Sequence, residues 1–429
     1  MMISTVLNII ALLFFMFLIM KYADKKQLSR VIIPALLLKI LSGLLVGVVF
    51  KFFYDGGDTY SYFEEGLRIS DYIRQHPKNV FRVFYATDQI FDLWYLLHFQ
   101  DQPRALFFSK IVAFFHLITH ANYWLMSIYF SLISFVGALL LITQLILKFS
   151  AIKTPAIVAF LFLPSVMFWS SGVLKESIAM FALYLMVAAM LAGLSNRNWK
   201  VWVWVLGFLL SGYLLWKLRY FYLGALLPLS VATLAAFIFE SHRHDIGLKK
   251  VSPWLIYFMI VVAGFFVMSK MHYNLHQDHI IDVLYQNYNL FAARSEPGSA
   301  VIFENLRPEI GSFLIYAPKA LFTGLFRPNI WEIYNWKQLP LTLENFVLLI
   351  ITIIGFYNML KNKPHISYWG MSLVLYVGIL SILLVYASPN FGSLIRYRTG
   401  YLSFFVLMIL YHNPVLGFLK GKFSGRKNS

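Results

Sequence analysis

Hydrophobic runs separated by short polar stretches recur along most of this chain. A helix needs about 20 apolar residues to cross a bilayer, so each such run predicts a membrane-spanning helix. We count about eleven runs: 2–20, 31–53, 123–147, 155–171, 174–194, 201–217, 221–239, 253–269, 341–360, 367–387 and 400–419. The pattern predicts an all-α polytopic membrane protein in which residues 1–429 form a single transmembrane bundle.

Two longer polar stretches, 54–104 and 270–340, interrupt this pattern. The first places apolar and aromatic residues at mixed helical spacing, which predicts short amphipathic helices lying in the membrane interface. The second contains the apolar segment 311–326, which Pro318 and Lys319 interrupt. We expect that segment to be re-entrant or interfacial rather than a full span.

Composition agrees with a membrane protein, since 60% of residues are hydrophobic and only 13% are charged. A soluble protein carries about 25% charged residues. The absence of cysteine excludes disulfides, thiolate catalysis and cysteine zinc sites. The net charge of +17 lies mostly in short loops, so we assign it to topology and contact with anionic lipid, not to nucleic acid.

Orientation follows from those basic loops, because cytoplasmic loops are rich in lysine and arginine. The clusters are Lys21, Lys25, Lys26 and Arg30; Lys148 and Lys153; Arg197 and Lys200; Arg243, Lys249 and Lys250; Lys361 and Lys363; and Lys420, Lys422, Arg426 and Lys427. Alternating spans put all of them on one side. We therefore expect an external N-terminus, a cytoplasmic C-terminus and extracytoplasmic loops at 54–104 and 270–340. The first run reads as a retained span, not a cleaved signal peptide.

Candidate chemistry begins at the acidic turn Tyr54–Tyr60, where Asp55 and Asp58 flank two glycines at the end of the second run. Placing carboxylates at a bilayer surface costs free energy, so a role in packing alone does not explain them well. They suit a general base acting on a sugar hydroxyl, or ligands of a divalent cation, Mg²⁺ or Mn²⁺. The structural alternative is a capped turn, with Asp58 as the N-cap of a following helix.

Basic side chains on the same predicted external face suggest a phosphate ligand, because arginine forks match phosphate oxygens and lysine adds a point charge. The set is Lys175, Arg219, Arg327, Arg396 and Arg398, with Glu176, Tyr60 and Glu332 as accompanying site residues. We predict that segment 388–399 is non-helical around Arg396 and Arg398, and that at least one of them faces the acidic turn. The alternatives are a self-paired helix start at Lys175 and Glu176, and arginines that only anchor the interface.

Histidines at 272, 276 and 279, near Asp278 and Asp282, have a spacing that would suit a metal. In a polar loop we expect a solvated face instead, and we predict no metal there.

With Asp55, Asp58, Tyr60, Glu64 and the helix-like segment 61–75, the chain resembles the GT-C superfamily of polytopic glycosyltransferases. The hairpin Pro164–Ser177 is similar to the next outer turn of such enzymes, which carries a charged residue. One departure is that the acidic motif follows the second predicted span, not the first. The resemblance implies a polyprenyl-phosphate or polyprenyl-diphosphate sugar donor, a glycan or lipid-linked acceptor, and a bacterial inner membrane.

The arginine-rich later loops also resemble the O-antigen and exopolysaccharide polymerases, so polymerase or ligase activity stays open beside single-sugar transfer. A transporter or flippase for a lipid-linked sugar is a third hypothesis. Transporters carry charges and broken helices near the bilayer midplane and often show inverted repeats. The charges noted above lie at one face and we see no repeat, which favours an enzyme.

Overall fold

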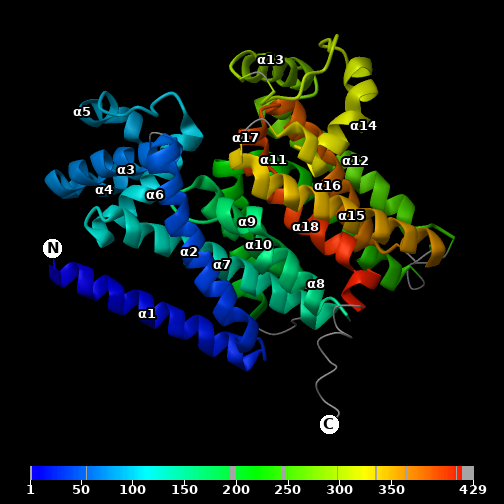
Figure 1. Cartoon of the computed structure of the whole chain (residues 1–429), viewed down its shortest axis with the longest axis horizontal. Coiled ribbons are helices and arrows are strands. Elements are labelled where there is room, and N and C mark those ends of the chain that lie inside the picture. The colour runs from blue at the N-terminus through cyan, green and yellow to red at the C-terminus, as the bar shows by residue number, and fades with distance from the viewer. Residues whose placement is uncertain are drawn as a thin grey trace. The chain divides into compact units, whose positions relative to one another are not determined.

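The computed structural model describes residues 2–54, 56–149, 151–193, 200–243, 248, 250–296, 298–333, 336–362, 366–411 and 413–417. These residues form helices and connecting turns, with one isolated antiparallel bridge between Ala300 and Asn390 (Figure 1). The chain divides into two compact units. Unit 1 comprises Met1–Ser150 and Phe160–Tyr220, and unit 2 comprises Ala151–Ala159 and Phe221–Ser429.

Unit 1 is built around α7, which packs against α2 and α10, while α3 packs against α6. Its helices are α1 (Met2–Lys25), α2 (Ser29–Phe53), α3 (Gly57–Gln75), η1 (Pro77–Asn79), α4 (Val80–Tyr85), η2 (Thr87–Gln89), α5 (Phe91–Trp94), α6 (Pro103–Thr119), α7 (Tyr123–Lys148), α9 (Pro164–Trp169) and α10 (Lys175–Gly193). Helix α11 (Lys200–His242) belongs to unit 1 up to Tyr220. In Figure 1, α2 runs from the end of α1 to the start of α3.

Small residues allow this close packing. A Cβ on Gly137 of α7 would lie 2.8 Å from the Phe181 backbone, and one on Gly43 of α2 would collide with Ser131 Oγ. Membrane helices associate through such small-residue contacts, because the hydrophobic effect does not drive helices together within lipid.

Unit 2 contains α8 (Lys153–Ile157), the rest of α11, α12 (Pro253–Met271), η4 (Tyr273–Leu275), α13 (Ile280–Ala293), α14 (Ile310–Phe326), η5 (Ile330–Glu332), η6 (Trp336–Gln338), α15 (Leu339–Asn362), α16 (Tyr368–Ala387), α17 (Phe391–Tyr397) and α18 (Thr399–Leu410). Tyrosine hydroxyls join these helices. Tyr386 donates to Phe313 O at 2.6 Å, and Tyr401 donates to Gly324 O at 2.6 Å. Each bond satisfies a phenol that would be costly to bury alone.

Among the described residues, eight helices are long and apolar enough to cross a membrane, or up to nine if the bent pair α17 and α18 forms one span. This is fewer than the eleven that we predicted, for three reasons. Segment 155–171 is a short α-helix, a π-helical turn at Val158–Phe162 and, after Leu163, α9. Runs 201–217 and 221–239 are counted together as α11, although α11 consists of two helices joined at a kink at Arg219 (φ −147°, ψ 63°), between the two predicted runs. Run 400–419 corresponds to α18, which ends at Leu410 and counts as a span only together with α17.

Segment 311–326 forms one helix, α14, which continues through Pro318 and is too short to count among the candidate spans, in agreement with the prediction that it is not a full span. Lys319 Nζ donates to Ile302 O at 3.1 Å and lies 5.3 Å from the Phe303 ring centroid. The lysine is thus accommodated at the edge of a continuous helix of 17 residues.

Candidate functional site

The acidic turn leads directly from α2 into α3. Gly56 (φ +88°) and Gly57 (φ +44°) take left-handed backbone conformations that glycine adopts without strain. Gly56 is the N-cap, so Asp58 does not cap α3 as the structural alternative had it. Asp58 instead lies exposed in the first helical turn. A carboxylate there is favoured by the helix dipole. Asp55 lies outside the described residues.

The residues after Asp58 fix the start of α3 to the rest of unit 1. Tyr123 OH lies 2.8 Å from Thr59 Oγ1, which donates to Val173 O at 2.9 Å. Tyr60 stacks on the Tyr123 ring at 4.5 Å between centroids and donates to Gly47 O at 3.2 Å. Partial burial raises the pKa of Tyr60, so its phenol stays neutral. The Asp58 backbone is therefore held by contacts with α2, α7 and the segment before α10.

That segment, 170–174, is a non-helical break between α9 and α10. Gly172 takes a φ of +70° and donates its N–H to Ser131 Oγ at 3.0 Å. Lys175, the first residue of α10, places its Nζ 4.9 Å from the Tyr62 ring centroid, at cation–π distance. Asp58 and Tyr62 lie four residues apart on α3 and share a face. The structure thus brings Lys175 to the helix face that carries Asp58.

Glu176 and Arg219 form a buried ion pair next to this face. Arg219 Nη2 donates to Glu176 Oε1, and the two side chains are 5% and 0% exposed respectively. The pair joins the start of α10 to the point where α11 loses helical geometry. Arg219, predicted to bind phosphate, is therefore engaged by a carboxylate of its own unit.

Unit 1 has three further cations that the sequence-based site omitted. The Arg104 guanidinium lies 5.2 Å from the Tyr220 ring centroid, Lys110 donates to Phe84 O at 3.1 Å, and Lys217 lies 6.0 Å from the Tyr213 ring centroid. Burial lowers the pKa of Lys110, Asp88 raises it and Lys217 lowers it further. Reading 103–119 as a helix beside α11, rather than as the end of a loop, would have grouped them.

In unit 2, Arg327 is paired with Glu332. Arg327 Nε donates to both Glu332 carboxylate oxygens, at 2.8 and 3.0 Å, and Asn329 N donates to Oε2 at 2.8 Å. Burial alone would raise the pKa of Glu332, but the hydrogen bonds from Arg327 and Asn329 outweigh it and hold the pKa below its ordinary value. Arg327 also lies 5.3 Å from the Phe391 ring centroid.

Arg396 and Arg398 overturn one prediction, because segment 388–399 is helical around them. Arg396 lies in the last turn of α17, and Arg398 joins α17 to α18 with helical angles (φ −65°, ψ −16°). The cause is Asn390, whose side chain accepts hydrogen bonds from Gly392 N and Ser393 N and so caps α17.

Arg398 is fully buried among polar groups of unit 2. It donates to Asn345 Oδ1 at 2.7 Å and to Arg327 O at 3.4 Å, and lies 3.8 Å from the Glu344 carboxylate. These contacts tie the α17–α18 junction to α15 and to the segment after α14.

The predicted site residues therefore fall into two groups. Unit 1 holds Asp58, Tyr60, Lys175, Glu176 and Arg219, and unit 2 holds Arg327, Glu332, Arg396 and Arg398. Within each unit the structure brings members together through the contacts above. That an arginine of unit 2 faces the acidic turn stays a prediction.

Sequence reasoning also missed Lys39, which lies in the middle of α2 and is only 3% exposed. Its Nζ donates to Ser170 O at 2.8 Å and Ser170 Oγ at 2.6 Å. Ser170 is the C-cap of α9, where a cation is favoured. The signal was present in the sequence, because a lysine inside the apolar run 31–53 is unusual.

Among the described residues, no group of three His, Asp or Glu side chains is placed to hold a metal ion. In the predicted histidine loop, His276 Nδ1 lies 3.4 Å from the Asp278 carboxylate, and His279 stacks on Tyr273. A divalent cation at Asp55 and Asp58 remains a proposal, since Asp55 lies outside the described residues.

Compared with known proteins, this chain matches no family model, no curated protein and no solved structure. Its function is therefore inferred from its own residues, and the likeness to GT-C enzymes stays a prediction from short motifs.

Proposed function

We propose that this protein is a membrane glycosyltransferase that moves a sugar from a polyprenyl-phosphate or polyprenyl-diphosphate carrier to a glycan or lipid-linked acceptor. The proposed setting is the outer face of a bacterial inner membrane, as part of cell-surface polysaccharide or glycoconjugate synthesis. The observation that carries the proposal is the position of Lys175 at the Tyr62 ring, four residues along α3 from the exposed Asp58, where Thr59 bonds Val173.

In the proposed reaction, the Asp58 carboxylate takes the proton of the acceptor hydroxyl. The acceptor oxygen then bonds to the anomeric carbon of the donor sugar, while the bond from that carbon to the phosphate oxygen breaks. Lys175 stabilises the negative charge that develops on the leaving phosphate. Because Thr59 bonds Val173, the base and the ammonium group are positioned by one local contact.

The other residues have supporting parts in this proposal. Glu176 and Arg219 position the start of α10 and hence Lys175. Arg396 is proposed to bind the carrier phosphate on guanidinium chemistry alone. Arg398, first expected in the same role, is fully buried against Asn345 and Glu344 and is proposed to position the α17–α18 junction instead. Arg327, with Glu332, is the remaining candidate for that role, and its ion pair would have to rearrange for a phosphate to bind.

The test uses purified protein in liposomes with a radiolabelled polyprenyl-linked sugar pool and an envelope glycan acceptor. Asp58→Asn should lower transfer at least 100-fold, because a general base contributes about 10²–10⁴ in rate. Asp71→Asn is the matched control, since Asp71 is an exposed carboxylate of α3 paired with Arg74. Equal activity of both variants would reduce Asp58 to a structural role.

Polymerase or ligase activity would use the same chemistry with a longer donor, so product length separates these functions. Single-sugar transfer gives one product size, whereas a polymerase gives a ladder and a ligase moves a finished chain.

A second candidate function, movement of a lipid-linked sugar across the membrane, is favoured by one observation in unit 1. Lys39 places an ionisable amine in mid-span beside the break between α9 and α10, and transporters carry broken helices and ionisable groups near the midplane. Sealed liposomes with a fluorescent lipid-linked sugar distinguish the two. Translocation without acceptor, lost in Lys39→Met but kept in Asp58→Asn, would replace the enzyme proposal with a flippase.

A further inference from the structure

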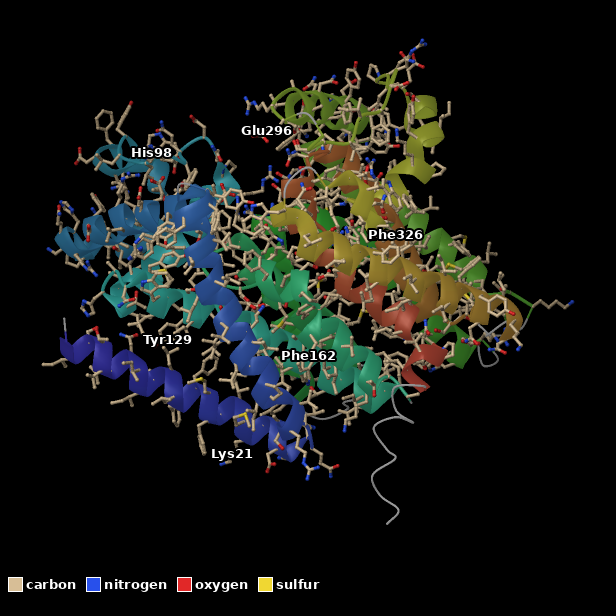
Figure 2. The ribbon with its side chains drawn as sticks, in the orientation of Figure 1. Lys21, His98, Tyr129, Phe162, Glu296 and Phe326 are labelled. Atoms are coloured by element: carbon tan, nitrogen blue, oxygen red, sulfur yellow. The ribbon has the colours of Figure 1, made fainter. Side chains whose placement is uncertain are left out.

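Unit 1 contains a cavity of about 460 Å³ at the end remote from Asp58. Its lining residues are Tyr22 and Lys25 of α1, Lys26 of the turn that follows α1, Gln144, Leu147 and Lys148 of α7, and Trp204 of α11. Helix α7 shows the separation, because it starts at Tyr123 beside Thr59 and ends at Lys148, which is 26 residues or about 39 Å along a helix. Figure 2 labels Lys21, next to the cavity residue Tyr22, and His98 at opposite ends of this unit.

Among the described residues, the cavity lining contains three lysines and no carboxylate. Gln144 adds an amide that donates hydrogen bonds, and Tyr22 and Trp204 are the amphipathic aromatics typical of a membrane–water boundary. Such a concave cationic surface fits one phosphate group, which is larger than a simple ion and carries several acceptor oxygens.

The walls are fixed by a contact between two helices. Tyr22 OH lies 3.1 Å from Thr143 Oγ1, which joins α1 to α7 directly beside the cavity. Lys25 and Lys148 therefore lie at the ends of two helices that contact each other, and Lys26 lies in the turn directly after α1.

An apolar surface leads along α1 to this cavity. Phe14 and Leu18 are 59% and 43% exposed. Leu18 lies 4 residues and Lys25 lies 11 residues after Phe14, so the three share one face of α1. Only 17% of the apolar window of α1 is buried inside the protein, so this face is available to acyl chains. A soluble phosphate would contact only the cationic cavity. A phospholipid would contact the cavity with its headgroup and the apolar face of α1 with its acyl chains.

We propose that this cavity binds the phosphate headgroup of an anionic membrane lipid, with its acyl chains along the Phe14 and Leu18 face of α1. Basic pockets between membrane helices on the cytoplasmic side bind anionic headgroups in this way. The site is independent of sugar transfer, because it lies at the other end of the unit from Asp58.

The experiment measures lipid retention by native mass spectrometry of the full chain in detergent, titrated with phosphatidylglycerol or phosphatidylcholine. The variant Lys26→Gln with Lys148→Gln removes two lining charges. The control variant, Lys250→Gln with Lys361→Gln, removes two exposed lysines from other basic loops on the same predicted side. We expect at least tenfold weaker phosphatidylglycerol binding in the cavity variant and unchanged binding in the control.

Lys26→Arg with Lys148→Arg keeps the charges and should restore binding, which separates loss of the site from misfolding. Asp58→Asn should bind the lipid as the wild type does. Equal loss in the cavity and control variants, or equal affinity for phosphatidylcholine, would overturn the proposal. Displacement of the lipid by glycerol phosphate at equal concentration would make this a site for soluble phosphates instead.

Discussion

Lys39 and Ser170 lie 131 residues apart in sequence, yet the lysine ammonium group donates hydrogen bonds to both oxygens of the serine, at 2.8 and 2.6 Å. The contact closes the end of α9 against the middle of α2. The buried lysine is tolerated there because it donates to the Ser170 carbonyl at the end of α9. The last carbonyls of a helix receive no hydrogen bond from within that helix.

Replacing Lys39 with methionine should destabilise the protein by about 1–3 kcal/mol, the cost of leaving a buried acceptor unsatisfied. Thermal unfolding in detergent measures this. Lys51→Met is the control, because Lys51 is an exposed lysine of the same helix. If Lys39→Met were more stable than the wild type, the cost of burying the ammonium group would exceed the value of its bonds, which favours a functional reason for keeping it.

The two Arg–Glu pairs should respond differently to loss of one charge. Glu176→Gln leaves Arg219 buried without its counter-charge, which should cost about 3–5 kcal/mol. Glu332→Gln breaks a pair whose side chains are each 20% exposed, and should cost about 1 kcal/mol or less. Unfolding of both variants in the same detergent compares them. Similar losses would mean that burial does not set the value of these pairs.

His116 predicts a pH dependence of stability. Its side chain is buried and Nε2 donates to Phe63 O at 2.7 Å. Burial lowers the pKa of His116 to about 4, against the raising effect of the bond to Phe63 and with a smaller lowering by Arg74. The unfolded chain takes up this proton near pH 6.5, so stability is full above that pH and falls as the pH drops toward 4, by about 3 kcal/mol in all.

His116→Gln keeps an N–H donor for Phe63 O and removes the titration. Thermal unfolding between pH 7.5 and pH 4.5 should show a smaller slope in this variant than in the wild type. His98→Gln is the control, because His98 lies outside this contact. An unchanged slope in His116→Gln would assign the acid sensitivity to other groups.

Lysine substitutions should distinguish the roles of Arg396 and Arg398. Arg398→Lys loses the fork that reaches Asn345 and Glu344, so it should lower thermal stability. Arg396→Lys should lower sugar transfer with little change in stability if Arg396 binds the carrier phosphate. Full transfer activity in Arg396→Lys would leave that residue with an anchoring role only.

Much of the helical pattern was predictable, because span length and apolar composition are local properties of the sequence. The errors arose where backbone geometry changes without a change in composition. Residues 158–162 are as apolar as their neighbours, yet they form a π-helical turn ahead of α9. Asn390 was a visible capping residue, but it lay inside a stretch that we read as a loop.

The site was less predictable, because its contacts join distant parts of the chain. Asp58 and Lys175 were both singled out, but the start of α3 and the segment before α10 are joined by the bond from Thr59 to Val173, 114 residues away. Glu176 was chosen for its place beside Lys175, and only the fold shows that Arg219 neutralises it. Sequence position alone does not distinguish an arginine that meets a ligand from one that meets a carboxylate.

The tight approach at Gly43 and Gly137 gives a means of finding distant relatives of this chain. Apolar residues that face lipid can be replaced by one another during evolution, so overall sequence similarity is lost quickly in such proteins. A side chain at either glycine would collide with Ser131 or with the Phe181 backbone. Relatives that share this packing should therefore keep small residues at these two positions, together with a lysine four residues before the first, even where the remaining sequence has diverged.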